Sequence, residues 1–337
     1  MTVAGSGEPP TRPRKPWQFW LRLTLGLGIL AIILARVDLS ALTIRWTQRA
    51  SIGVVLAIIL LASAQALSAW RWKVLIGAAA PPWRYLYRLY LTGAFFSLFL
   101  PTSVGGDAVR AVAVTQAIPD TGRAVGSVLL DRIVGMLALV LYTLLGLAVL
   151  PGLMTSLGNR LQWKLPPWAL AVGLLGLVLV ALAAYRWRTR LGKLGTVLQG
   201  IWSTLQTLLR DPARCAAALA LGLVVQAVYI GVWYTLSSAL ALPVPGLALL
   251  IMVPIVSLSA MAPVTFSGIG IREGVWVLLL GQFGIVAADA LGFSLLYFAC
   301  WIVVAGFGGV LFALKGTRLP DDRPPIALTN EAGSGQS

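Results

Sequence analysis

Long apolar runs, separated by short polar or basic loops, constrain the fold of this chain more than any other feature. A helix rises about 1.5 Å per residue, so roughly 20 apolar residues cross the hydrocarbon core of a bilayer. Six runs reach this length, at about residues 18–35, 51–70, 124–150, 168–185, 214–240 and 287–314. They predict an all-α polytopic membrane protein with six full spans.

The composition agrees with this class and excludes others. Of the 337 residues, 58% are hydrophobic and 11% are charged, whereas about a quarter of a soluble domain is charged. The net charge of +15 comes from basic residues at the ends of the apolar runs. The positive-inside rule and anionic headgroups account for that placement, so nucleic acid is not expected as a partner. The chain has no histidine, and we expect neither a metal site nor a cofactor.

Two further apolar regions, 89–118 and 247–283, are broken by proline and glycine at matching places. Each reads proline, four residues, glycine, three residues and arginine, with a carboxylate close to the arginine. The matching residues are Pro101, Gly106 and Arg110 in the first region, and Pro263, Gly268 and Arg272 in the second. Broken apolar segments at corresponding places in two halves indicate the binding site of a transporter built from internal repeats.

The basic loops predict the topology. The loop with Arg71, Lys73, Arg84 and Arg88, the loop after 168–185, and both tails are expected on the cytoplasmic side. The first broken region must then enter and leave from the cytoplasm, and its first limb, Leu89 to Leu100, is about 18 Å long, too short to cross the bilayer. By the same reasoning, the second region enters and leaves from the outside. We therefore expect two re-entrant helical hairpins in addition to the six spans, arranged as an inverted repeat.

This topology divides the chain into three parts. Residues 1–16 and 319–337 are expected to be disordered cytoplasmic tails. Residues 17–318 form the integral membrane domain, with repeat halves of about 17–150 and 166–315. The stretch 191–209 has apolar residues at helical spacing and is expected to lie as an amphipathic helix on the cytoplasmic surface.

Ionisable residues inside apolar segments are rare and are functional candidates by default. Here they are Asp107, Arg110, Asp131, Arg132, Arg272 and Glu273. A guanidinium presents a planar fork to phosphate and is always charged, so the arginines suit an anionic headgroup. Glycines let the backbone approach a ligand, and helices that begin after them direct N–H groups toward an anion; these are Gly105, Gly106, Gly268 and Gly270. The alternative is that each arginine is neutralised by its neighbouring carboxylate and only holds its segment in place.

Several of these segments are similar to a known family. They are Arg71-Trp-Lys, Gly93 to Pro101, Gly105 to Arg110, Ser127 to Gly135 and Ser267 to Gly274. The chain resembles the flippase-like family that includes the transmembrane region of lysylphosphatidylglycerol synthase. The resemblance implies a non-enzymatic translocase for an anionic lipid or a polyprenyl-phosphate-type substrate. It also implies a bacterial or archaeal plasma (inner) membrane, and Arg110, Asp131, Arg132, Arg272 and Glu273 as the site. The chain ends about twenty residues after its last span, so we expect no soluble synthase domain.

Two other functions stay open on the sequence. One is a membrane-embedded transferase that acts on a lipid-linked substrate, with Asp107, Asp131 or Glu273 as its general base. The other is a non-transporting accessory subunit of a lipid or glycan synthesis system. Membrane lipids are the expected partners, and the oligomeric state is open, a homodimer included.

Overall fold

The computed structural model describes residues 47–99, 105–118, 120–150, 202–203, 205–206, 208–261 and 268–317. The regular secondary structure of these residues is helical, and they contain no strand. Four of their helices are long and apolar enough to cross a membrane: α2 (Gln48–Ile76), α5 (Thr121–Val149), α9 (Pro212–Ala239) and α12 (Ala287–Lys315). The spans predicted at 51–70, 124–150, 214–240 and 287–314 are thereby confirmed as helices of spanning length.

Other predictions fall outside the described residues. These are the spans at 18–35 and 168–185, both tails, Pro101 and Pro263, and most of the stretch 191–209. Within that stretch, residues 202–203, 205–206 and 208–209 are helical.

Side-chain caps set the starts of three long helices. The hydroxyl of Thr47 accepts a hydrogen bond from the backbone N–H of Ala50 before α2. Asp120 and Asp211 cap α5 and α9 in the same way. Each cap satisfies backbone donors that have no partner inside the helix. At its other end α2 stops at Gly77, whose φ of +79° suits glycine, and a short 3₁₀ turn, η2 (Gly77–Ala79), follows.

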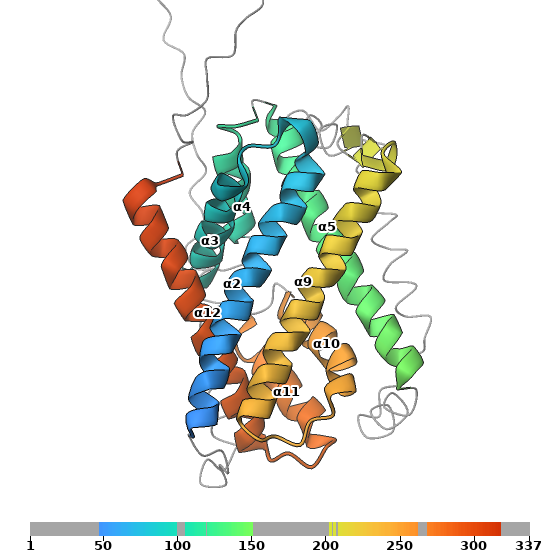
Figure 1. Ribbon diagram of the computed structural model, residues 1–337, viewed down its shortest axis with the longest axis vertical. Coiled ribbons are helices and arrows are strands. Elements are labelled where there is room, and N and C mark those ends of the chain that lie inside the picture. The colour runs from blue at the N-terminus through green and yellow to red at the C-terminus, as the bar shows by residue number, and fades with distance from the viewer. Residues whose placement is uncertain are drawn as a thin grey trace, which may run out of the picture.

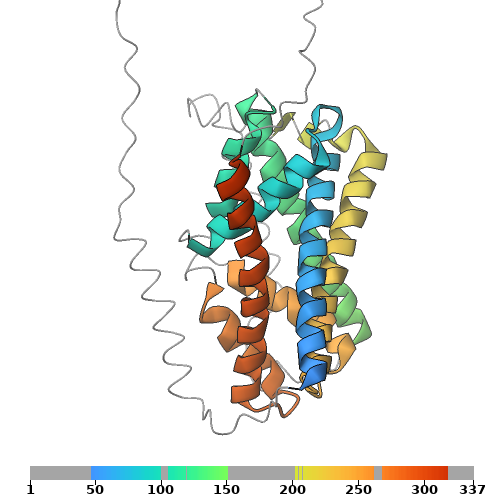
Figure 2. The same ribbon diagram turned by 60° about the vertical axis from the view of Figure 1, so that its left-hand side comes forward.

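Two pairs of shorter helices complete the described bundle. The first pair is α3 (Trp83–Phe99) and α4 (Gly105–Val114). The second is α10 (Leu249–Met261), preceded by the 3₁₀ turn η4 (Gly246–Ala248), and α11 (Ile271–Gly281). The first pair lies toward one end of the bundle and the second pair toward the opposite end (Figures 1 and 2).

The first limb of the first pair is longer than expected. Helix α3 has 17 residues and begins at Trp83 rather than at Leu89, which makes it about 25 Å long. It starts earlier because Tyr85 and Leu86 are fully buried and extend the apolar face that packs under α2. The limb predicted from Leu89 to Leu100 is therefore too short, because the helix begins six residues earlier.

The helices pack across the two halves of the chain. Helices α2 and α9 lie side by side and antiparallel (Figure 1). The broken pair of each half packs against the last long helix of the other half, α3 on α12 and α10 on α5. Both contacts need a glycine, because a Cβ at Gly308 would overlap the carbonyl oxygen of Leu91 and a Cβ at Gly146 would overlap the side chain of Ile251.

Helices α2 and α12 finish at the same end of the bundle at which α5 and α9 begin (Figure 1). Basic residues of the described chain lie close to this end. They are Lys73, Arg84, Arg88, Arg123, Arg210, Arg214 and Lys315. At the opposite end the described residues include Arg49. We call the end with more basic residues the basic end. The positive-inside rule associates such an excess of lysine and arginine with the cytoplasmic side.

Candidate functional site: a buried charged cluster

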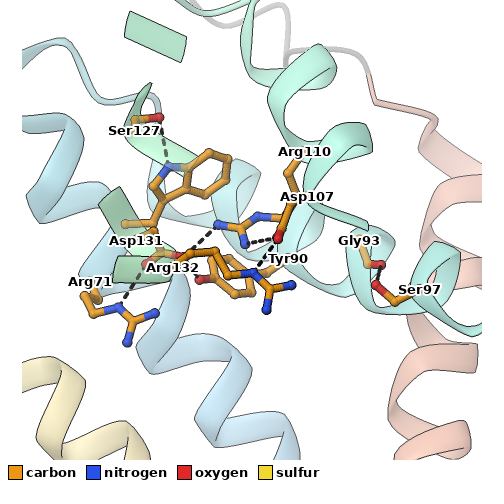
Figure 3. A network of polar contacts seen from close by, with 10 residues as sticks. Arg71, Tyr90, Gly93, Ser97, Asp107, Arg110, Ser127, Asp131 and Arg132 are labelled. Atoms are coloured by element: carbon orange, nitrogen blue, oxygen red, sulfur yellow. Dashed lines mark hydrogen bonds and ion pairs between the residues drawn. The ribbon is translucent and has the colours of Figure 1, made fainter. Parts of the chain in front are cut away.

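Three helices bring five charged residues together near the basic end (Figure 3). Arg71 comes from α2, Asp107 and Arg110 from α4, and Asp131 and Arg132 from α5. We call these five residues the charged cluster. The structure thus places four of the predicted site residues next to one another and adds Arg71.

Asp131 lies at the centre of the charged cluster. Its carboxylate accepts hydrogen bonds from Arg71 Nε at 2.9 Å, from Arg110 Nη2 at 3.0 Å and from the hydroxyl of Tyr90. Only 2% of the residue is exposed. Because the three donors belong to α2, α4 and α3, this one carboxylate joins three helices to α5.

Asp107 lies at the edge of the cluster, in the first turn of α4. Its carboxylate accepts from Arg110 Nη1 at 3.1 Å and from Arg132 Nε. A carboxylate in the first turn of a helix also interacts favourably with the helix dipole. Asp107 therefore sits where a helix N-terminus and two guanidinium groups converge.

Aromatic rings hold Arg110 from two sides. Its guanidinium carbon lies 3.7 Å from the ring centre of Tyr90 and 4.3 Å from that of Trp72. Trp72 is itself held by a hydrogen bond from its indole N–H to Ser127 Oγ, at 3.1 Å. Arg110 Nε has no hydrogen-bond partner among the described residues. The rings and the two aspartates fix the guanidinium in a buried position.

The charged cluster forms one wall of a cavity of about 310 Å³. The remaining walls come from α2, α3, α5 and α9, with contributions from α10 and α12. Uncharged polar side chains of the lining include Gln65, Ser68, Gln226 and Tyr229. The Nε2 of Gln65 donates a hydrogen bond to the Tyr229 hydroxyl at 2.7 Å. The charged residues of the described lining are three arginines and two aspartates, which gives a formal charge of +1.

Glycine allows α4 to start at this cavity. Gly106 lines it and faces Gly93 of α3, and a Cβ on Gly106 would overlap the Gly93 carbonyl oxygen. Ser97 Oγ donates to that same carbonyl at 2.9 Å. Together with the preceding Gly105, which is also buried, these residues let α3 and α4 cross at close range.

Arg272 and Glu273 occupy a separate place at the start of α11. Glu273 is fully buried and accepts from the backbone N–H of Gly270 at 2.7 Å, from Arg272 Nε at 2.9 Å and from Ser294 Oγ at 3.2 Å. Gly268 and Gly270 have φ values of +74° and +87°, which form the turn before α11. Neither Arg272 nor Glu273 is among the described residues that line the cavity. The two matching segments of the sequence therefore lie in different surroundings.

The sequence interpretation missed Arg71 as a site residue and was wrong to assign it to a loop. Helix α2 continues to Ile76, so Arg71 lies inside the helix and is buried. The helical spacing of Gln65, Ser68 and Arg71 could have indicated a polar stripe on one face. Tyr90 and Trp72 carried no comparable signal, because an aromatic residue in an apolar segment is normally part of the core.

Comparison with known proteins assigns the family. The family model for the lysylphosphatidylglycerol synthase TM region matches residues 19–309, which include the whole charged cluster as well as Arg272 and Glu273. The chain belongs to this family. It is therefore a membrane protein, in agreement with its four spanning helices. No curated protein and no solved structure shows significant similarity to it.

Proposed function

We propose that the protein is a non-enzymatic translocase that moves an anionic lipid, of the phospholipid or polyprenyl-phosphate type, between the leaflets of the plasma membrane. The lipid headgroup binds at the charged cluster. The observation that carries the proposal is a cavity inside the helix bundle, whose described lining residues carry a formal charge of +1.

An uncompensated charge in a low-dielectric interior is costly, so buried charges are paired or meet a ligand. Asp107 and Asp131 balance two of the three arginines of the charged cluster. A bound anion would balance the third. Arginine also suits phosphate oxygens, because its fork can donate two parallel hydrogen bonds.

The size of the cavity suits a headgroup rather than a whole lipid. Pockets for small ligands occupy roughly 300–1,000 Å³, and this cavity is at the lower limit with about 310 Å³. A headgroup bound there would leave the acyl chains in the bilayer. That arrangement is the one that movement between leaflets requires.

An inverted repeat would let the cavity open on either side in turn. Helices α3 and α10 pack in equivalent ways on α12 and α5, through Gly308 and Gly146. These two glycines have the same separation in the sequence as Arg110 and Arg272. We propose that both broken pairs are re-entrant, that the termini are cytoplasmic, and that Arg272 and Glu273, with Gly268 and Gly270, meet the headgroup in the state open to the other side.

Reconstitution tests the function directly. Purified protein is inserted into phosphatidylcholine liposomes that contain a trace of fluorescent phosphatidylglycerol, and a membrane-impermeant quencher follows the loss of the inner-leaflet pool. We expect faster exposure of this lipid than in protein-free liposomes, and slower exposure with Arg110→Ala at equal protein density. Fluorescent phosphatidylcholine is the control lipid. A rate for the anionic lipid equal to that of protein-free liposomes would refute the proposal.

A further inference from the structure

We infer that Asp107 is an internal competitor of the lipid headgroup. Its carboxylate occupies the place of the substrate anion between Arg110 and Arg132 when the site is empty, and it yields this place when the headgroup binds. The inference rests on the proposed function and adds a residue that controls affinity, release and the preferred headgroup charge.

The surroundings of Asp107 are those of an anion-binding site. Both of its hydrogen-bond donors are arginine side chains, from Arg110 and Arg132. It stands in the first turn of α4, where backbone N–H groups favour an anion. The Arg132 side chain is 32% exposed and the Asp107 side chain 11% exposed, so this pair is the accessible edge of the charged cluster.

The other two carboxylates of the predicted site are held too firmly to be exchanged. Asp131 accepts from three helices and is 2% exposed. Glu273 accepts from a backbone N–H as well as from Arg272 and Ser294. Displacing either would leave buried donors without an acceptor, which is expensive. Displacing Asp107 would expose two guanidinium groups that the incoming anion then binds.

An internal competitor solves a problem that every transporter has. Binding must be favourable enough for the substrate to enter and weak enough for it to leave. With Asp107 in place the charged cluster carries +1 and matches a headgroup with one negative charge. Without the Asp107 charge the cluster carries +2, which favours tighter binding and a headgroup closer to two negative charges, such as a phosphate monoester.

The test compares Asp107→Asn with the unchanged protein. Binding is measured by calorimetry in detergent with dioctanoyl phosphatidylglycerol, a phosphodiester, and with dioctanoyl phosphatidic acid, a monoester. Transport is measured in the liposome assay described above. We expect the dissociation constant to fall at least about tenfold, with a larger decrease for phosphatidic acid, and the maximal transport rate to fall severalfold. Asp211→Asn is the matched control, because it removes the same charge at the basic end while asparagine still caps α9, and it should change neither quantity.

Unchanged or weaker binding by a folded Asp107→Asn protein would overturn the inference. If that variant does not fold, Asp107→Ser removes the same charge and carries the same expectations. Arg132→Gln separates this inference from the proposed function, because it should weaken binding if the headgroup site is correct. Loss of binding in Arg132→Gln without a gain in Asp107→Asn refutes the competitor alone, whereas normal binding in Arg132→Gln refutes the headgroup site itself.

Discussion

Asp131 is the residue whose loss should damage the fold most. Replacing it with asparagine keeps its shape but removes the charge that balances Arg71 and Arg110, at 2.9 Å and 3.0 Å. The asparagine amide would also place a donor near the guanidinium groups and the Tyr90 hydroxyl, which are donors themselves. The charged cluster would then hold a formal charge of +2 in the interior.

The size of this effect follows from the geometry of the two ion pairs. Two unit charges about 4 Å apart attract by about 4 kcal/mol at an effective dielectric constant near 20. Part of this lost attraction is offset, because the variant no longer bears the desolvation cost of a buried carboxylate. Removing one partner of a buried pair typically costs about 3–5 kcal/mol, and Asp131 serves two partners. We therefore expect Asp131→Asn to destabilise the protein by at least about 3 kcal/mol.

The assay is denaturant unfolding of the purified protein in detergent, followed by tryptophan fluorescence. A double variant tests the cause, because Arg71→Gln together with Asp131→Asn restores the formal charge of +1. Its loss of stability should be smaller than the sum of the two single losses. If Asp131→Asn costs less than about 1 kcal/mol, or if the two changes are simply additive, the central role of this carboxylate is wrong.

Three further predictions concern function, packing and topology. Arg110→Lys keeps the charge but loses the guanidinium fork and its stacking on Tyr90 and Trp72. Liposome transport should therefore fall at least about tenfold, while membrane insertion stays normal. Transport at the unchanged rate would contradict this role of Arg110. Gly106→Ala places a methyl group against the Gly93 carbonyl and should lower the free energy of unfolding by about 1–3 kcal/mol, measured by the same unfolding assay. An unchanged denaturation midpoint would show that α3 and α4 can separate freely. Arg123→Cys, in a cysteine-free background, should react with an impermeant maleimide only from the cytoplasmic side, and labelling from outside would reverse the orientation.

The charged cluster shows where sequence reasoning reached its limit. Asp131 and Arg132 are adjacent in the chain and read as a pair, but neighbouring residues on a helix point in different directions. In the structure Asp131 binds Arg71 and Arg110, whereas Arg132 binds Asp107. Each of the two residues therefore has its partner on another helix, which no local pattern indicates.

The second broken segment shows the opposite case. Arg272 and Glu273 are also adjacent, and here the neighbours do bind each other. The glycine turn before α11 lets Glu273 fold back to the N–H of Gly270, which brings its carboxylate to Arg272. Two segments with the same spacing thus acquire different surroundings, because the helices packed around them supply different side chains.

The sequence by itself determined that this is a helical membrane protein and where four of its spans lie. These properties depend on the length and polarity of local segments, because every backbone polar group in a bilayer must be satisfied within its own helix. The tertiary structure alone decided that Arg71 belongs to the site, that Asp131 joins α2, α3 and α4 to α5, and that Arg272 lies apart from the cavity. Those facts depend on which faces of distant helices meet. Because an unpaired buried charge is unfavourable, each charged side chain pairs with an opposite charge that the packing brings close to it.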